Sequence, residues 1–545
     1  MIRRARLLAA TCAALSLGAS LVRAQAPARG GSAAPDLVLT GGKVFTADSL
    51  HPWAEAIAIR GDRILAVGAN AEVRRLAGRT TREIALGGRV VIPGIDDAHD
   101  HLGAIPLGVQ IQTSPSPTPD PTFGQVLDSL RRVVARTPAD RWIEANVGLR
   151  VLDDTAARRK ALDRAAPHRK VVLWTWWGHG AVLSSAAMGA LGIADSAADP
   201  LGGWYERRSD GRLTGRLDEY ARWNATERLY STLPESALVK TLRAFADSSL
   251  RMGVTSVQDM AGYEEPALTV RAFRDAKLPI RVRLVRWPSP SDMGRNEEPW
   301  NAVSEHPAPR VTVSGRKWIV DGTPLERNAL QRQPYADGSH GRLNFPLDTV
   351  RAILAEALRP GAVPLHLHVV GDSATLLVLD AMEALAPDSV WRSKRLRIEH
   401  GPGIVGPAVA RAKRFGIVIA QPRGGAPLRT WHDAGIPLAY GSDGFRNPFY
   451  HFMTAVTGES SPAEALTREE AATMLTRGSA YAERAEHEKG TLAPGMLADV
   501  AVLSQDIFTA PARALPGTTS VLTIVGGRIV LDELTSGDAR AVRER

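Results

Sequence analysis

One short segment carries most of the information about the architecture, and it reads Val91-Ile92-Pro93-Gly94-Ile95-Asp96-Asp97-Ala98-His99-Asp100-His101. An apolar run ends here in two histidines that are separated by a single residue. Alternate side chains of a strand share a face, so both imidazoles can point at one ion. Because such a pair also arises by chance, its interpretation depends on whether the rest of the chain supplies further metal-binding residues near it.

Apolar runs of strand length alternate with amphipathic stretches over residues 93–489. The stretches 347–358 and 374–385 show apolar residues three and four apart, as helices do. This alternation predicts βα units, and their count favours a closed β/α barrel of the TIM type over an open sheet. The region at about 115–235 is too long for one barrel segment, so we interpret it as an insertion or as elaborated loops near the barrel mouth. The strand candidates are 254–257, 318–320, 365–370, 396–398, 417–420 and 437–440.

Both ends of the chain have the pattern of short strands. Residues 36–92 alternate apolar and polar side chains between glycine pairs, and a similar pattern returns within 490–535. Short runs of this kind that are bounded by Gly and Asp are typical of hairpins. We therefore expect the two ends to build one small flanking β-module together.

The N-terminus has the pattern of a secretory signal peptide. Arg3, Arg4 and Arg6 precede an apolar run that ends in small residues near Ala24. The run is shorter than the roughly 20 residues that a spanning helix needs, so stable membrane insertion is not expected. Residues 1–24 are predicted to be removed, residues 25–35 to form a flexible lead-in, and the protein to be exported to the periplasm or secreted. The single cysteine, Cys12, lies within the signal, which leaves no disulfide or thiolate in the mature chain.

Composition excludes several classes of function. The net charge of +9 is spread without a dense basic run, and hydrophobic residues make up 44% of the chain, as in ordinary globular proteins. Nucleic acid is therefore not an expected partner. No Gly-rich phosphate loop is present, so nucleotide chemistry has no support.

Further residues suited to metal chemistry follow the predicted strands. They are Lys317, His366 or His368, His400 and Asp443. Each has an ordinary explanation when taken alone, since a lysine is usually a surface amine and an aspartate after Gly-Ser is often a helix cap. In a β/α barrel, however, strand ends converge on one face, so residues far apart in sequence meet there.

In this order, the motifs resemble amidohydrolase family 3, particularly its YtcJ-like branch. The resemblance runs from about residue 36 to residue 530 and implies a (β/α)8 barrel with a flanking β-sandwich built from both chain ends. The motifs that carry it lie at 93–102, 317–329, 368–372, 397–400, 441–443 and 489–503.

The resemblance also implies a site for one or two divalent metal ions. His99, His101, His368 and His400 would be ligands, with His368 preferred over His366 because it has the HxxGD spacing of the family. Lys317 holds the place of a lysine that can carry CO2 as a carbamate and bridge two ions. Asp443 matches the aspartate that binds metal and moves the proton.

Two residues resemble substrate-pocket positions of this branch, His179 and Arg327. An exposed loop histidine and a surface arginine are equally good explanations of them. The chain departs from the branch at Ser373, where an arginine is usual, and in the loop 322–327, which reads Gly-Thr-Pro-Leu-Glu-Arg. These departures lie in substrate-facing loops, so they bear on substrate class more than on hydrolysis.

Together these features predict a hydrolase of small molecules that cleaves an amide-type C–N bond with water activated by a metal, Zn²⁺ being the usual ion of histidine-rich sites. A carbamate on Lys317 would favour two metal ions, whereas an unmodified ammonium would favour one. Hydrolysis of an ester, lactone or phosphoester at the same site is an alternative, as is an inactive periplasmic ligand-binding protein. A homodimer is one assembly that the sequence allows.

Overall fold

The computed structural model describes residues 34–105, 108–111, 120–420, 425–459 and 461–534. The predicted signal peptide, Cys12 and most of the lead-in lie outside these ranges. Within them, the strands form four sheets, of which the largest has eight strands. No helix in the described ranges has the length and apolar character needed to cross a bilayer.

The eight-stranded sheet is the centre of the molecule, and all its neighbouring strands are parallel. Its two outer strands meet, because Ala98 N donates to Tyr440 O at 2.8 Å. This hydrogen bond closes the sheet, and the predicted β/α barrel is confirmed. Its strands in spatial order are β8 (Ile95–Asp100), β15 (Val254–Ala261), β16 (Arg281–Arg286), β17 (Val311–Ile319), β18 (Leu365–Val369), β19 (Arg397–His400), β20 (Val418–Ala420) and β21 (Leu438–Ala439).

Helices cover the outside of the barrel. In α10 the residues Val350, Ile353 and Leu354 are buried, which is the spacing of three and four seen in the sequence. The helices around the barrel are α7 (Glu235–Arg251), α8 (Pro266–Ala276), α9 (Glu298–Asn301), α10 (Leu347–Ala357), α11 (Asp372–Leu385), α12 (Asp388–Lys394), α13 (Pro407–Phe415), α14 (Leu428–Asp433), α15 (Pro448–Thr457), α16 (Arg468–Thr473) and α17 (Ser479–Glu483).

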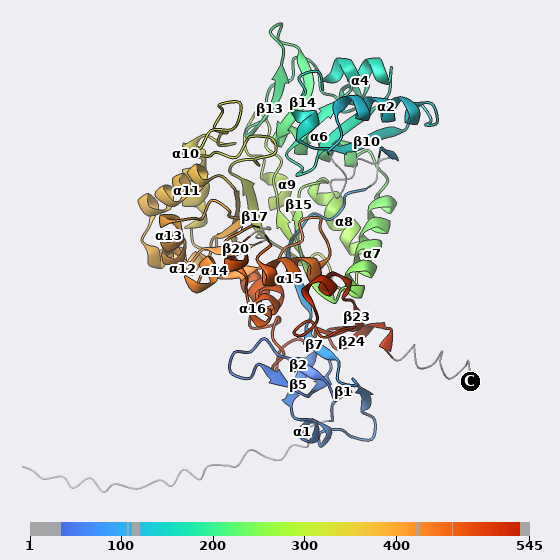
Figure 1. Ribbon diagram of the computed structural model, residues 1–545, viewed down its shortest axis with the longest axis vertical. Coiled ribbons are helices and arrows are strands. Elements are labelled where there is room, and N and C mark those ends of the chain that lie inside the picture. Colours follow the sequence, from blue (N-terminus) through green and yellow to red (C-terminus); the bar gives the residue numbers. More distant parts are fainter. Residues whose placement is uncertain (1–33, 106–107, 112–119, 421–424, 460, 535–545) are drawn as a thin grey trace, which may run out of the picture.

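Strands from both chain ends lie together at one end of the molecule (Figure 1). One sheet has the order β5-β4-β1-β6, and the other, β24-β23-β22-β7-β2-β3, joins the N-terminal and C-terminal segments. Both sheets contribute to one hydrophobic cluster that includes Leu39, Ile57, Val91 and Val500. The members are β1 (Leu37–Thr40), β2 (Lys43–Phe45), β3 (Trp53–Ala54), β4 (Ala56–Arg60), β5 (Arg63–Gly68), β6 (Arg82–Ala85), β7 (Val90–Pro93), β22 (Val500–Leu503), β23 (Ser520–Val525) and β24 (Arg528–Asp532), with the short helix α1 (Asn70–Arg74) beside them.

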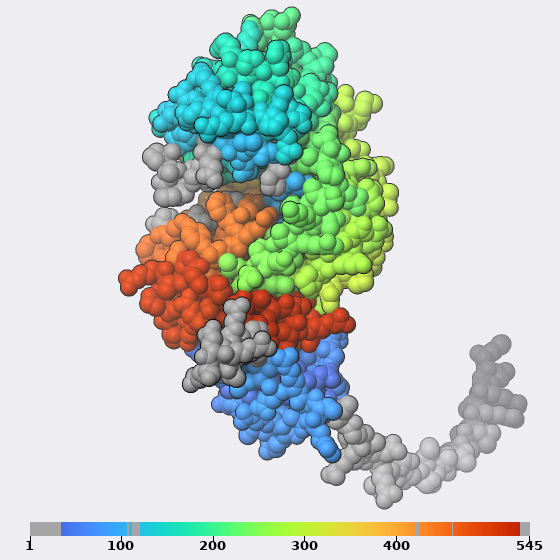
Figure 2. Space-filling view, turned by 90° about the vertical axis from the view of Figure 1, so that its right-hand side faces the viewer, coloured from blue at the N-terminus to red at the C-terminus, as the bar shows by residue number. Residues whose placement is uncertain are grey.

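The inserted region lies at the opposite end of the elongated molecule (Figures 1 and 2). It has a six-stranded mixed sheet of its own, in the order β13-β14-β12-β11-β10-β9, and the sheet begins earlier than the predicted insertion. Its elements are β9 (Gly108–Ile111), α2 (Phe123–Val134), β10 (Trp142–Val147), α3 (Leu149–Leu152), α4 (Arg159–Ala165), β11 (Val171–Thr175), β12 (Gly180–Leu183), α5 (Ser185–Ala190), β13 (Gly203–Arg207), β14 (Leu213–Glu219) and α6 (Tyr220–Tyr230).

Candidate active site

The two histidines of the opening segment meet at the end of β8. His99 Nε2 and His101 Nε2 are 3.4 Å apart, as expected for alternate positions of one strand. The strand is buried along its whole length, so only a small, closely packed set of groups can surround it. Gly94, which precedes β8, shows how tight this packing is, because a Cβ atom there would lie 2.1 Å from Thr255 Oγ1 on β15.

Lys317 and Asp443 approach this pair from two other places in the barrel. Lys317 Nζ on β17 lies 3.2 Å from His99 Nε2. Asp443, just after β21, has Oδ1 at 3.4 Å from His101 Nε2 and 3.7 Å from His99 Nε2. Its backbone N donates to His99 O at 2.8 Å, which ties the end of β21 to the end of β8.

His400 and His368 complete the group. The ring centroid of His400 lies 5.3 Å from that of His99 and 4.5 Å from that of His368. Ligand atoms of His99, His400 and Asp443 all lie within 4.8 Å of one another. The structure therefore brings together all six side chains that the sequence nominated as ligands, and their roles there stay predictions.

Two of these residues have unusual backbone conformations. His400 has φ +69° and Asp443 has φ +46°, in the left-handed region that non-glycine residues adopt at a cost. On a regular strand, Glu399 and His400 would face opposite sides. The turn at His400 lets both consecutive side chains reach His99.

The arrangement distinguishes His368 from His366. His368 Nε2 is buried and has no hydrogen-bond partner among the described residues, and its ring lines the cavity of the site. His366 Nδ1 instead contacts Glu399 Oε1 at 3.1 Å, and its Nε2 lies 3.5 Å from Arg283 Nη2. The geometry thus agrees with the preference for His368.

A divalent cation fits this set of donors. His368 Nε2 needs a partner, burial lowers the pKa of His99, His101 and His368 and so keeps their rings neutral, and Asp443 supplies an oxygen. Burial also lowers the pKa of Lys317 to about 8, which increases the fraction of neutral amine at that position.

Behind these groups lies a carboxylate that the sequence analysis did not nominate, Glu399. Its Oε2 is 2.6 Å from His99 Nδ1, and its Oε1 is 2.6 Å from Arg397 Nε. Although burial raises it, the charges of Arg397 and His99 and the hydrogen bonds hold the pKa of Glu399 well below its usual range. A signal was available in the sequence, since Glu399 directly precedes His400 on the strand.

A cavity of about 390 Å³ opens between the barrel and the inserted region, and all of the six residues except His99 line it. In Figure 2 the surface is hollowed between these two parts. Aromatic side chains from both parts line the cavity, and so do Arg222 and Glu144, which the sequence analysis also left unnamed. The aromatic residues are Trp174, Trp176, Trp177, Trp223, Tyr230, Tyr263, Trp287 and Phe445.

The two predicted substrate contacts have different surroundings. His179 is buried, lines the cavity, and has Nδ1 at 2.9 Å from Glu219 Oε2, so it is not an exposed loop histidine. Burial lowers the pKa of His179 to about 4. Arg327 lies outside the residues that line this cavity and forms ion pairs with Asp153 at 2.5 Å and Asp337 at 3.0 Å. A substrate role for either residue stays a prediction.

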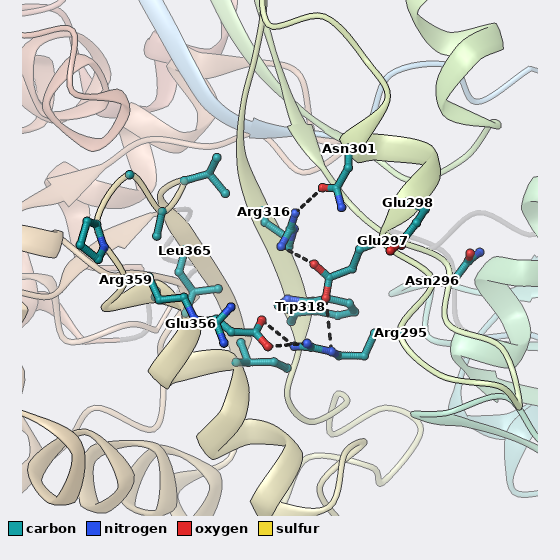
Figure 3. A pocket seen from close by; sticks show the side chains of 16 residues that line it. Arg295, Asn296, Glu297, Glu298, Asn301, Arg316, Trp318, Glu356, Arg359 and Leu365 are labelled. Atoms are coloured by element: carbon teal, nitrogen blue, oxygen red, sulfur yellow. Dashed lines mark hydrogen bonds and ion pairs between the residues drawn. The ribbon is translucent and has the colours of Figure 1, made fainter.

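A larger cavity, of about 620 Å³, lies on the outer side of β17 (Figure 3). It is lined by Trp318, which directly follows Lys317 on the strand. Neighbouring side chains of a strand point to opposite faces, so Trp318 faces away from the site. Two of its arginines are paired, Arg295 with Glu356 and Arg316 with Glu297 (Figure 3). None of the six candidate ligands lines this cavity.

Comparison with known proteins places this geometry in a family. Residues 82–531 match the amidohydrolase family, and the chain belongs to it. It is similar to the N-substituted formamide deformylase of Arthrobacter pascens, with 28% identity over 516 residues that cover 86% of this chain and 94% of the relative. The protein is accordingly a hydrolase of the metal-dependent, amidohydrolase type.

Solved structures have the same fold. A metal-dependent hydrolase from Pyrococcus horikoshii OT3 superposes with a TM-score of 0.65 at 19% identity, over 88% of this chain and 99% of that chain. The atrazine chlorohydrolase TrzN from Arthrobacter aurescens TC1, crystallised with zinc, gives a TM-score of 0.51 at 18% identity, over 93% of this chain and 98% of that chain.

Proposed function

We propose that this protein cleaves a non-peptide C–N bond of amide type in a small molecule, with Zn²⁺ as the metal. The observation that carries the proposal is the convergence of Asp443 on His101 and His99, at 3.4 Å and 3.7 Å, beneath a cavity of about 390 Å³. The likeness to a formamide deformylase supports the choice of bond.

His99, His101, His368, His400 and Asp443 would hold the cation. When bound, the cation lowers the pKa of water toward about 7 and polarises the electrophile. Asp443 accepts a proton from the attacking water and then donates it to the leaving nitrogen, so that the amine departs neutral. The neighbouring Glu399 holds the His99 ring in place through Nδ1, at 2.6 Å.

Lys317 sets the number of ions in this proposal. Its neutral Nζ would attack the carbon of CO2, forming an N–C bond as one C=O π bond opens to an oxyanion. The proton lost from the nitrogen would pass to water, which gives a carbamate anion. Burial, which lowers the pKa of this amine to about 8, favours that addition. Two ions are proposed for the carbamate, and one for the free lysine.

The test combines metal analysis with turnover of a panel of N-formyl and N-acyl amines. We expect stoichiometric metal and C–N hydrolysis in the wild type, and a loss of about 10²–10⁴-fold in kcat for Asp443→Asn. Asparagine tolerates positive φ, so the backbone at 443 is retained. Asp433→Asn, at an exposed position on α14, is the matched control and should keep full activity.

Two outcomes contradict the proposal. Turnover of esters, lactones or phosphoesters without any C–N hydrolysis would assign the site to another reaction. Stoichiometric metal without turnover of any class would favour a ligand-binding protein.

We also propose that the chain is exported after removal of residues 1–24, which lie outside the described residues. The basic start and the apolar run that follows support this. Protein recovered from the periplasm or medium of an expressing bacterium should begin near Gln25. Retention of Met1 in all of the cellular protein would contradict export.

We propose two further structural features, one in the fold and one in the assembly. The two sheets at the chain ends are proposed to form the β-sandwich of this family, because they share one hydrophobic cluster. A homodimer is proposed as the assembly, and light scattering of the purified protein tests it.

A further inference from the structure

Arg222 is a buried cation that forms no ion pair with any of the described residues. It lies on α6 with only 7% of its surface exposed, and it lines the cavity above the candidate metal ligands. Its Nε and Nη1 atoms are buried and have no hydrogen-bond partner among the described residues. A buried, unpaired charge is destabilising by several kcal/mol, so such a group is usually retained for a ligand.

The neighbours of Arg222 among the described residues do not accept hydrogen bonds from its Nε and Nη1 atoms. The guanidinium carbon lies 4.8 Å from the ring centroid of Trp174 and 5.9 Å from that of Tyr263. Such cation–π contacts involve the face of a ring and do not satisfy N–H donors. Glu144 lines the same cavity, but its oxygens accept hydrogen bonds from Trp174 Nε1 at 3.2 Å and from Gln110 Nε2 at 3.3 Å.

Two arginines of the outer cavity provide a contrast within the same chain. Arg295 pairs with Glu356, and Arg316 pairs with Glu297 and with Asn301 (Figure 3). Those guanidinium groups have protein partners and need no ligand. Arg222 differs from them by being more deeply buried while lacking such a partner among the described residues.

Tyr263 connects Arg222 with the candidate metal site. Its ring centroid lies 5.6 Å from that of His101 and 5.9 Å from the guanidinium carbon of Arg222. Trp287 lies 5.3 Å from His101 on the same cavity wall. A ligand that reaches from Arg222 to the metal ligands therefore passes over aromatic surface.

We propose that Arg222 binds a carboxylate group of the substrate, so that the preferred substrate is an amide with an apolar or aromatic body and a carboxylate at the end away from the scissile bond. This rests on the proposed function, which puts the scissile bond at Asp443. One planar guanidinium pairs with one carboxylate through two parallel N–H···O bonds.

The experiment compares two probes that differ only at the carboxyl end, the anion 4-(formamidomethyl)benzoate and its neutral methyl ester. Both are assayed with metal-loaded wild type, Arg222→Gln and Arg359→Gln. The last variant removes an exposed arginine of the outer cavity and serves as the matched control. Binding of p-toluate, a carboxylate without an amide, is measured by calorimetry on the same three proteins.

In wild type we expect a higher kcat/KM for the acid than for the ester. In Arg222→Gln the acid-to-ester ratio of kcat/KM should fall at least ~10-fold and p-toluate should bind at least ~10-fold more weakly, as loss of a charged hydrogen bond predicts. Arg359→Gln should match the wild type in both measurements. Should the Gln variant fail to fold, Arg222→Lys is used instead. It keeps the positive charge but loses the planar pair of N–H donors, and it should also lower the acid-to-ester ratio of kcat/KM.

The outcomes separate the inference from the proposed function. Hydrolysis of both probes with the same ratio in wild type and the Arg222 variants overturns the inference and leaves the proposed function intact. Arg222-dependent binding of p-toluate without hydrolysis of either probe supports the carboxylate subsite and contradicts the proposed function. If neither probe is hydrolysed and p-toluate does not bind, both the inference and the proposed function are overturned.

Discussion

Glu399 links the candidate metal ligand His99 to the polar interior of the barrel. Its two oxygens contact His99 Nδ1 at 2.6 Å and Arg397 Nε at 2.6 Å. A carboxylate on the far nitrogen of a ligating imidazole fixes the ring orientation and the tautomer that leaves the other nitrogen free for a metal.

Replacement of Glu399 by glutamine should therefore weaken metal binding by about 10–100-fold. Arg397 keeps Gln258 Oε1 as an acceptor at 2.6 Å, so its guanidinium is not left without a partner in the variant. Competition with a chelator of known affinity measures the effect. Glu488→Gln, which changes an exposed ion pair with Arg63, is the control, and equal affinities in both variants would contradict the positioning role.

His179 makes the stability of the protein depend on pH. Burial lowers its pKa from 6.5 to about 4, so the unfolded chain binds a proton below pH 6.5 that the folded protein does not bind until about pH 4. The free energy of unfolding therefore falls as the pH drops through 6.5, and this loss is complete below about pH 4.

Between pH 7 and pH 5, the free energy of unfolding should fall by about 2 kcal/mol more in the wild type than in His179→Gln, which lacks this titrating group. Urea unfolding of the metal-free proteins at the two pH values measures the difference. His487→Gln, at a side chain that is 90% exposed, should follow the wild type. The same pH slope in all three proteins would show that His179 does not titrate on unfolding.

At the level of elements, the join between β7 and β8 places the first two candidate ligands. Gly94 separates the sheet of the chain ends from the barrel, and its N donates to Asp499 O at 2.9 Å. A Cβ atom at this position would lie 2.1 Å from Thr255 Oγ1, a contact that real structures do not tolerate.

Gly94→Ala should therefore destabilise the protein by about 1–3 kcal/mol, the usual cost of overpacking. Gly189→Ala tests whether the cost comes from the contact, because a Cβ atom there meets nothing within 4 Å and the residue lies in α5. That control should be neutral or more stable by up to ~1 kcal/mol. Denaturant unfolding compares both variants, and equal stabilities would refute the close packing of β8 on β15.

The barrel strands with continuous apolar runs were predictable from the sequence. The runs at 365–370 and 417–420 correspond to β18 and β20, because a strand covered by helices on its outer side needs apolar residues. In contrast, β16 escaped prediction. It reads Arg281-Val-Arg-Leu-Val-Arg286, a pattern typical of a half-exposed strand, yet Arg283 is buried against Gln258 and Ser314.

The candidate ligands were predictable for a related reason, since barrel topology brings strand ends together whatever the loops between them do. The inserted sheet and the wall of the cavity could not be predicted from the sequence. The pairing of β9 with β10 and of β12 with β14 depends on contacts between distant segments, which no local pattern encodes. For the same reason, the roles of Arg222 and Glu399 could be inferred only from the residues that lie near them in the folded structure.

Across the whole molecule, the candidate ligands come from both sides of the seam that closes the barrel. His99 belongs to β8, and Asp443 follows β21, the strand at the other edge of the sheet. Among the described residues, Ala98 N to Tyr440 O and Asp443 N to His99 O are backbone hydrogen bonds across this seam, both at 2.8 Å. A metal ion shared by these edges would add a further link, in addition to its part in chemistry.

Metal removal should therefore destabilise the folded protein as well as abolish activity. At a free metal concentration 100 times the dissociation constant, binding to the folded state alone adds about 2.7 kcal/mol to the free energy of unfolding. Thermal unfolding of chelator-treated protein, titrated with Zn²⁺, should show a rising Tm that saturates with the recovery of hydrolysis. His368→Asn should give a smaller rise, because it removes a buried nitrogen that has no protein partner among the described residues, whereas His487→Asn should give the full rise. A Tm that does not respond to Zn²⁺, or responds equally in both variants, would mean that these side chains do not share a metal ion.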